Sequence, residues 1–208
     1  MARYGIVIDL KRCYGCYSCV MACKQANRTP PGVFWCRVLR GEMGEFPSSV
    51  RQALPVLCMQ CAEPDCMKVC PTGATYQTDD GIVRVDKEKC IGCKYCMMAC
   101  PYGARYSVGE WKSYFPEGLP LSDYEKHCMQ VWEEKRGCGV ATKCDFCIDR
   151  RAEGREPACV QVCPGKARVF GDLDDPESEI SYLIKTKRGF VLRPEVGTEP
   201  KVYYLPPR

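Results

Sequence analysis

The residues in this sequence that could carry out chemistry are its cysteines. The chain has nineteen in 208 residues, far more than an ordinary globular protein uses. In the run from Cys90 to Cys100 the cysteines are separated by two, two and three residues, and Pro101 follows. Three further groups repeat this arrangement with variations. The four groups are Cys13, Cys16, Cys19 and Cys23; Cys58, Cys61, Cys66 and Cys70; Cys90, Cys93, Cys96 and Cys100; and Cys144, Cys147, Cys159 and Cys163.

This spacing is typical of ligands to a 4Fe-4S cluster. Each iron of the cube takes one soft thiolate, and the four thiolates must converge from different directions. Three cysteines spaced two residues apart wrap around three corners, which leaves the fourth corner to a distant residue. In bacterial ferredoxins with this pattern the fourth cysteine binds the other cluster of a pair, and the proline after it ends its helix. The groups are therefore expected to work in pairs.

The second and third groups are joined by a predicted hairpin. Strands are predicted over residues 74–78 and 82–86, because Asp80-Gly81 supplies the left-handed backbone that a tight turn requires. Residues 58–106 are thus expected to form one continuous two-cluster unit, and short helices should follow the first cysteines of each group.

The first and fourth groups supply the parts of a second unit. A strand is predicted over residues 4–10, before the first group, whereas the long stretch from Lys24 to Leu57 is predicted to be irregular and without a hairpin. The predicted fold class is α+β, with two pseudo-symmetric ferredoxin-like units, one inserted in the other. Residues 1–57 with 144–172 would form the discontinuous unit around residues 58–106.

This pairing gives a hypothesis for four 4Fe-4S clusters, with about sixteen irons per chain. Within each unit the two clusters exchange their fourth ligands. The four ligand sets are Cys13, Cys16, Cys19 with Cys163; Cys144, Cys147, Cys159 with Cys23; Cys58, Cys61, Cys66 with Cys100; and Cys90, Cys93, Cys96 with Cys70. No catalytic residue is predicted among them or elsewhere.

Two other uses of cysteine compete with this hypothesis. Pairs spaced by two residues also build zinc ribbons, but zinc needs neither a third cysteine at that spacing nor a following Cys-Pro. A disulfide scaffold would require many small, strained loops. Cys36 is expected to be a small core residue. His127, Cys128 and Cys138 could bind a metal together only if a fourth ligand were present. His127 is expected to be structural or exposed.

The rest of the chain is expected to frame these units. Residues 107–143 lack clear periodicity and are predicted to be an insertion on the surface or against a partner. A helix is predicted over residues 175–185, with Asp175 as its cap, Pro176 in its first turn and one apolar face. Residues 173–208 form this helix and a tail, in which residues 201–205 are a predicted edge strand.

The formal charge of +4 does not by itself indicate nucleic-acid binding. Each cluster with its thiolates adds about −2, so four clusters bring the total to about −4. Seven basic residues lie beside the ligands in sequence. Each one alone is expected to be solvated, but together they could raise the reduction potentials by offsetting cluster charge. They are Lys24, Lys68, Lys94, Arg105, Lys143, Lys166 and Arg168.

Neither a signal peptide nor a membrane span is expected. The apolar run near the N-terminus is short and interrupted by Asp9, and no run of about eighteen apolar residues occurs. Membrane association would then come through a partner. Two compartments stay open, the cytoplasm, or the periplasm if the chain is exported folded with a partner subunit.

In its four groups, their order and the eleven residues between Cys147 and Cys159, the chain resembles a known family. It is similar to the four-cluster iron–sulfur subunit of the molybdenum or tungsten bis-pterin oxidoreductases of the dimethyl sulfoxide reductase type. The resemblance covers nearly the whole chain. Its tail, residues 193–204, is similar to that of thiosulfate, polysulfide and arsenate reductase small subunits. Other matching segments are residues 5–10, 70–74, 100–103 and 171–176.

The resemblance implies that a separate large subunit holds the pterin cofactor and acts on substrate. This chain would relay single electrons between that subunit and a quinone-binding membrane anchor subunit or a soluble carrier, with the unit of groups one and four facing the catalytic subunit. The complex is expected to be an anaerobic reductase. The alternatives are the same kind of subunit in a phenol transhydroxylase or dehydroxylase, and a free-standing polyferredoxin adaptor, which should have shorter segments at 24–57 and 107–143.

Overall fold

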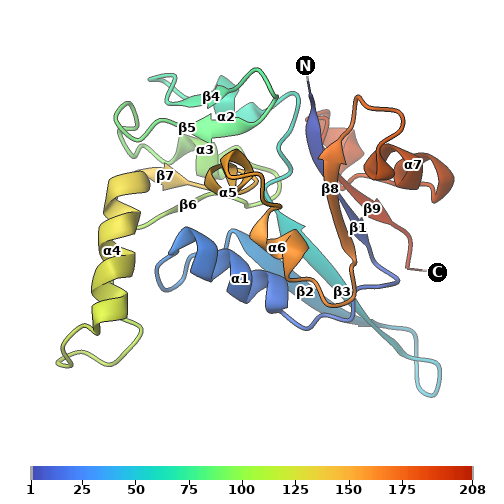
Figure 1. The fold of residues 1–208 in the computed structure, drawn as a ribbon, viewed down its shortest axis with the longest axis horizontal. Coiled ribbons are helices and arrows are strands. Elements are labelled where there is room, and N and C mark those ends of the chain that lie inside the picture. Colours follow the sequence, from blue (N-terminus) through green and yellow to red (C-terminus); the bar gives the residue numbers. More distant parts are fainter. Residues whose placement is uncertain (1, 208) are drawn as a thin grey trace.

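The computed structural model describes residues 2–207 and has a mixed helix and strand fold (Figure 1). Its three-stranded sheet has the order β8-β1-β9. Strand β1 (Tyr4–Asp9) lies in the middle, antiparallel to β8 (Arg168–Asp172) and parallel to β9 (Val202–Leu205). The sheet thus joins segments from near both ends of the chain. It confirms the strand predicted at the N-terminus and the edge strand predicted in the tail.

Strand β1 is buried on both faces. Ile6 and Ile8 enter the main core, which also contains many of the cysteines. On the other face Val7 packs with Ile180 and Leu205 in a small second cluster. A continuous apolar strand is the pattern expected where both faces of a sheet are covered.

Helix α7 (Glu179–Thr186) covers this second face and is shorter than predicted. The expected start at Asp175 is wrong, because Ser178 is the N-cap and its Oγ accepts a hydrogen bond from Ser181 N. Asp175 instead accepts from Glu177 N in the preceding turn. Aspartate and serine bond local backbone equally well, so both residues suited the cap. A 3-10 turn, η1 (Pro194–Val196), follows.

The hairpin between the second and third cysteine groups is confirmed. Strands β4 (Thr75–Gln77) and β5 (Val83–Val85) pair antiparallel, and Gly81 in the turn has φ 75°. Short helices α2 (Asp65–Lys68) and α3 (Tyr95–Met98) lie against each other beside it.

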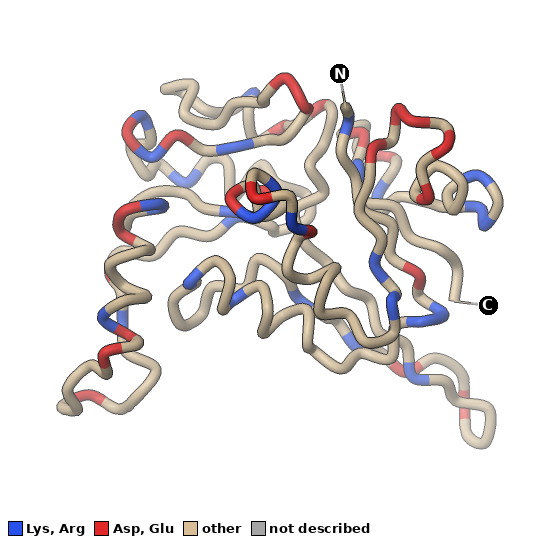
Figure 2. Tube along the Cα trace, in the orientation of Figure 1, with Lys and Arg blue, Asp and Glu red and all other residues tan. Residues whose placement is uncertain are grey.

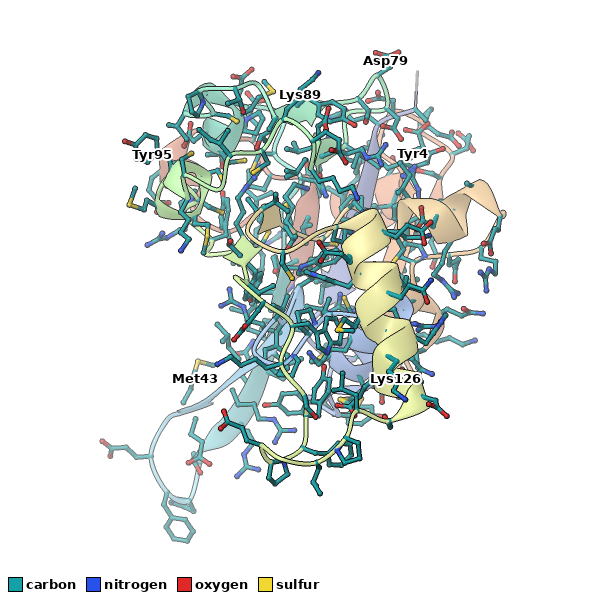
Figure 3. The ribbon with its side chains drawn as sticks, turned by 90° about the vertical axis from the view of Figure 1, so that its left-hand side faces the viewer. Tyr4, Met43, Asp79, Lys89, Tyr95 and Lys126 are labelled. Atoms are coloured by element: carbon teal, nitrogen blue, oxygen red, sulfur yellow. The ribbon has the colours of Figure 1, made fainter. Side chains whose placement is uncertain are left out.

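The prediction that the stretch after the first cysteine group is irregular is wrong. The stretch forms a hairpin of β2 (Cys36–Met43) and β3 (Val50–Leu57), which projects from the body of the molecule and carries Met43 toward its tip (Figure 3). Two features hid it. The outer half is exposed on both faces and so lacks alternation, and Pro55 lies within a strand, which a two-stranded ribbon tolerates because each strand has a free edge.

The segment predicted to be an unpatterned insertion also contains regular structure. Its ends are joined by β6 (Tyr106–Ser107) and β7 (Ala141–Thr142), and between them runs α4 (Asp123–Lys135). Ser122 and Glu125 form a reciprocal capping box. Its sequence signature was missed because the segment shows no clear periodicity. Trp132 of α4 is fully buried, with its ring centroid 6.0 Å from that of Trp35.

The other helices are α1 (Ser18–Asn27), α5 (Ile148–Ala152) and α6 (Ala158–Gln161), and α1 packs against α6. Cysteines lie within α1 and α6, and Cys147 is the N-cap of α5. Acidic and basic residues are interspersed along the trace (Figure 2). Within residues 2–207 every helix is too short or too polar to cross a bilayer.

Candidate metal centres

The first three cysteines of the chain meet a cysteine from near its other end. Cys13, Cys16, Cys19 and Cys163 all line one cavity, which has about 380 Å³ of space free of protein atoms. Cys163 and Cys19 both help to raise the pKa of Cys13, although burial is the largest cause. Ala167 N donates to Cys163 Sγ at 3.3 Å. This is the first predicted ligand set.

The backbone between these cysteines turns through left-handed conformations. Gly15 has φ 72° and Tyr17, which precedes α1, has φ 63°. The third cysteine group repeats the pattern, with Gly92 at φ 68° and Lys94 at φ 63° before α3. Such turns bring successive N–H groups to one side and create concave sites for anionic groups, including iron–sulfur clusters.

A second set of thiols is deeply buried. Burial and the thiols of Cys23, Cys147 and Cys159 raise the pKa of Cys144 well above its usual value. Burial, followed by Cys159, raises the pKa of Cys147 to about 11. Asn27 Nδ2 lies within 3.6 Å of Cys23 Sγ and 3.9 Å of Cys147 Sγ. The structure thus brings Cys23 from α1 to the fourth group.

The second cysteine group meets a thiol of the third. Burial and then the charges of Cys58, Cys66 and Cys100 raise the pKa of Cys61 to about 12, although a hydrogen bond from Thr198 opposes the rise. Cys100 is therefore a neighbour of the second group.

The reciprocal contact involves Cys70. Burial raises the pKa of Cys96, and the thiols of Cys90 and Cys70 add to the rise. Backbone N–H groups donate to two of these thiols, from Thr75 to Cys70 and from Ala141 to Cys90, both at 3.4 Å. Cys93 of the third cysteine group is exposed.

The donors around these thiols suit thiolate-bound clusters. Backbone and side-chain N–H groups reach several sulfur atoms, and two guanidinium nitrogens, Arg105 Nε and Arg168 Nη1, are buried without a hydrogen-bond partner within residues 2–207. The inorganic sulfides of a cluster are acceptors that suit such orphaned donors. In the same part of the chain, no three His, Cys, Asp or Glu side chains are grouped closely enough to hold a single metal ion. Cys128, Cys138 and exposed His127 therefore form no such group.

Gln60, which lies in the second cysteine group, connects that group to the fourth. We did not predict this role from the sequence. Gln60 is fully buried, and its Nε2 donates to Cys144 O at 2.6 Å while its Oε1 accepts from Val83 N at 2.8 Å. Cys58 is also among the thiols whose charge raises the pKa of Cys144. The only sequence signal for Gln60 was its position within a Cys-x2-Cys pair.

The prediction that each basic residue beside the ligands is solvated is wrong for three of the seven. Arg105, Lys143 and Arg168 are each 4% exposed, whereas Lys68, Lys94 and Lys166 are exposed as expected. Lys143 Nζ donates to Cys144 O at 2.8 Å. The prediction failed because bonds to carbonyls and thiols can replace water around a cation only once the chain has folded around it.

Lys24 is half-buried and spans a loop. Its Nζ donates to the carbonyls of Thr29, Pro30 and Val33 at 3.4, 3.0 and 3.0 Å. The ammonium also lies 4.5 Å from the ring centroid of Phe34. This residue, which replaces the proline found after other fourth cysteines, therefore closes the loop after α1.

Cys36 is a buried core residue, as predicted, but it also contacts the first set. A hydrogen bond from Cys36 lowers the pKa of Cys19, and Arg168 Nη2 lies 3.3 Å from Cys36 Sγ. Sequence spacing gave no indication of this role.

Comparisons with known proteins agree with this chemistry. A family model described as a 4Fe-4S dicluster domain matches residues 50–114 and 122–173. A selenate reductase subunit of Mesobacillus selenatarsenatis is 47% identical over 98% of this chain and 72% of its own length. A putative dimethyl sulfoxide reductase iron–sulfur subunit of Halobacterium salinarum is 44% identical, over 99% and 79%. The arsenate respiratory reductase iron–sulfur subunit of a Shewanella strain is 38% identical, over 98% and 96%.

Proposed function

Because the chain belongs to the family of iron–sulfur subunits of dimethyl sulfoxide reductase-type complexes, we propose that it is the electron-transfer subunit of such a complex. It relays single electrons through four 4Fe-4S clusters to or from a catalytic subunit that carries a molybdenum or tungsten pterin. The observation that carries this proposal is the convergence of thiols from distant parts of the chain into four neighbouring sets.

The four clusters are held by the ligand sets predicted from the sequence. Cys163 completes the set of Cys13, Cys16 and Cys19, and Cys23 completes that of Cys144, Cys147 and Cys159. Cys100 completes the set of Cys58, Cys61 and Cys66, and Cys70 completes that of Cys90, Cys93 and Cys96. The shared cavity of the first set and the thiol neighbours within the others support this assignment.

The four sites follow one another in a row. Arg168 lies beside the first two sets, Gln60 spans the middle two, and Arg105 lies beside the last two. These contacts support two pseudo-symmetric units, residues 1–57 with 144–172 around residues 58–106. Residues 107–143 would be an insertion, and residues 173–208 a helix that packs on the discontinuous unit and a tail that contacts both units.

Electrons enter and leave where the clusters come closest to the surface. Cys16 is exposed at one end of the row, beside Tyr14 and Tyr17, which are 64% and 38% exposed. Cys93 is exposed at the other end, two residues before Tyr95 in the sequence. Tyr95 is 55% exposed at the surface (Figure 3). Exposed aromatic side chains are enriched at protein interfaces. The Cys16 end faces the catalytic subunit, and the Cys93 end faces a soluble carrier or a quinone-binding membrane subunit.

Iron analysis tests the cofactor content. The purified protein should contain about sixteen irons and sixteen acid-labile sulfides per chain. A value near eight, or zinc in place of iron, contradicts the four-cluster proposal.

Partner binding tests the complex. A large subunit with bound pterin should co-purify with this chain, and Tyr14→Glu should weaken that association because it places a charge in an aromatic interface. Tyr182→Glu, on exposed α7, is the matched control and should not weaken it. Isolation of the fully loaded chain without a large subunit would favour a free-standing adaptor.

A further inference from the structure

Two buried arginines occupy equivalent positions in the sequence. Arg105 is the fifth residue after Cys100, and Arg168 is the fifth residue after Cys163. Each follows the pattern Cys-Pro-x-x-Ala-Arg, and each is 4% exposed. The turn that ends each of these cysteine groups therefore delivers a guanidinium to the interior.

Arg105 lies between two sets of thiols. Its Nη2 donates to Cys66 Sγ at 2.9 Å and its Nη1 donates to Thr75 Oγ1 at 3.1 Å. Thr75 in turn donates its backbone N–H to Cys70 Sγ at 3.4 Å. Cys66 and Cys70 belong to different ligand sets, so one guanidinium lies beside both sets.

Arg168 has the same relation to the other two sets. Its Nη2 is 3.5 Å from Cys19 Sγ. Strand β8, which begins at Arg168, also packs against α6, which contains the buried Cys159. Cys19 and Cys159 again belong to different sets.

Thiols are the counter-charges of both arginines. Neither guanidinium lies within ion-pair distance of a carboxylate in residues 2–207. A buried cation without a carboxylate partner is costly unless other anionic groups surround it. The cluster with its thiolates supplies that negative charge, about −2 when oxidised and about −3 when reduced.

We propose that Arg105 and Arg168 are electrostatic links, each of which raises the reduction potentials of the two clusters of its own unit together. A fixed positive charge stabilises the more negative reduced state, and because each arginine lies beside thiolates of two clusters it favours reduction of both. Each unit would then offer two sites of similarly raised potential to a passing electron. This inference rests on the proposed four-cluster function.

Potentiometry followed by electron paramagnetic resonance on the purified complex tests the links. Arg105→Gln should lower two of the four cluster potentials, and Arg168→Gln should lower the other two. We expect at least a tenfold change in the ratio of reduced to oxidised cluster, or about 59 mV for a one-electron couple. Arg105→Lys keeps the charge and should produce a smaller shift than Arg105→Gln.

The control is Lys89→Gln, which removes a positive charge one residue before Cys90 from a side chain that is 66% exposed. Solvent screens this charge, so all four potentials should stay unchanged. Unchanged potentials in both arginine-to-glutamine variants, or a shift of only one cluster in each, overturn the proposal. If both variants lose iron, the arginines are needed for cluster assembly rather than for setting the reduction potentials. That result also overturns the proposal. An iron content below sixteen in the wild-type complex would instead contradict the proposed function.

Discussion

At the scale of single residues, the thiols are held in surroundings that differ from one set to the next. The set of Cys144, Cys147 and Cys159 is buried, whereas Cys16 and Cys93 are exposed at the two ends of the row. Cluster potential depends on solvent exposure and on hydrogen bonds to sulfur. The four clusters are therefore expected to differ in potential even though every ligand is a cysteine.

The exchange of fourth ligands can be tested at Cys100. Cys100→Ala should remove or alter the cluster of Cys58, Cys61 and Cys66, because its thiol neighbours Cys61. Electron paramagnetic resonance should show the same lost signal as in Cys66→Ala, and the iron content should fall by up to about four per chain.

Two comparisons give this test its controls. Cys96→Ala should alter a different signal, because its thiol neighbours Cys90 and Cys70. Cys128→Ala, at a buried cysteine on α4, should leave all four signals intact. If Cys100→Ala instead matched Cys96→Ala, the fourth ligands would not be exchanged.

At the scale of elements, residues 107–143 are ordered by α4. The carboxylate of Glu125 accepts from Ser113 Oγ at 2.7 Å, Tyr114 N at 3.0 Å and Ser122 N at 3.1 Å. These bonds, of which the one from Ser113 has the largest effect, lower the pKa of Glu125 to about 2. One carboxylate thus closes the cap of the helix and fixes the loop before it.

Ser122→Ala should loosen α4 specifically. It removes the acceptor of the 3.2 Å bond from Glu125 N, and loss of such a cap costs about 0.5–2 kcal/mol. Hydrogen exchange should show lower protection of the α4 amides, with α7 unchanged. Ser178→Ala, at the N-cap of α7, should give the reverse result. Equal protection of α4 in wild type and Ser122→Ala would show that packing of Trp132 alone holds the helix.

At the scale of the whole molecule, Gln60 joins segments that are far apart in the chain. Its side chain connects the second cysteine group to Cys144 and to strand β5. A fully buried amide that satisfies two backbone groups fixes how the segments meet. The way in which the second and fourth cysteine groups meet therefore depends on this residue.

Gln60→Leu should weaken that junction. It leaves Val83 N without its acceptor, and an unsatisfied buried group costs about 1–3 kcal/mol, whereas Cys144 O keeps the bond from Lys143 Nζ. We expect protection of the Val83 amide against hydrogen exchange to fall by roughly tenfold or more. Gln25→Leu, at an exposed position on α1, should not change it. Unaltered protection at Val83 in Gln60→Leu would contradict this role.

Residue patterns that act over a few positions are sufficient to predict the chemistry and the local turns. Thiolate spacing, Cys-Pro and Asp-Gly act within a few residues of one another, so the cysteine groups, the hairpin of β4 and β5 and the strand β1 could be predicted without a structure. The mixed helix and strand class followed from the same local patterns.

The burial of polar groups and the contacts between distant segments became apparent from the folded structure alone. Arginine and glutamine are usually surface residues, but Arg105, Arg168 and Gln60 are buried. They lie inside because sulfur and carbonyl acceptors from other segments surround them. The β2–β3 hairpin likewise lacked alternation because its outer half contacts little of the molecule. Burial of a polar group depends on partners that are remote in sequence, and no local pattern records them.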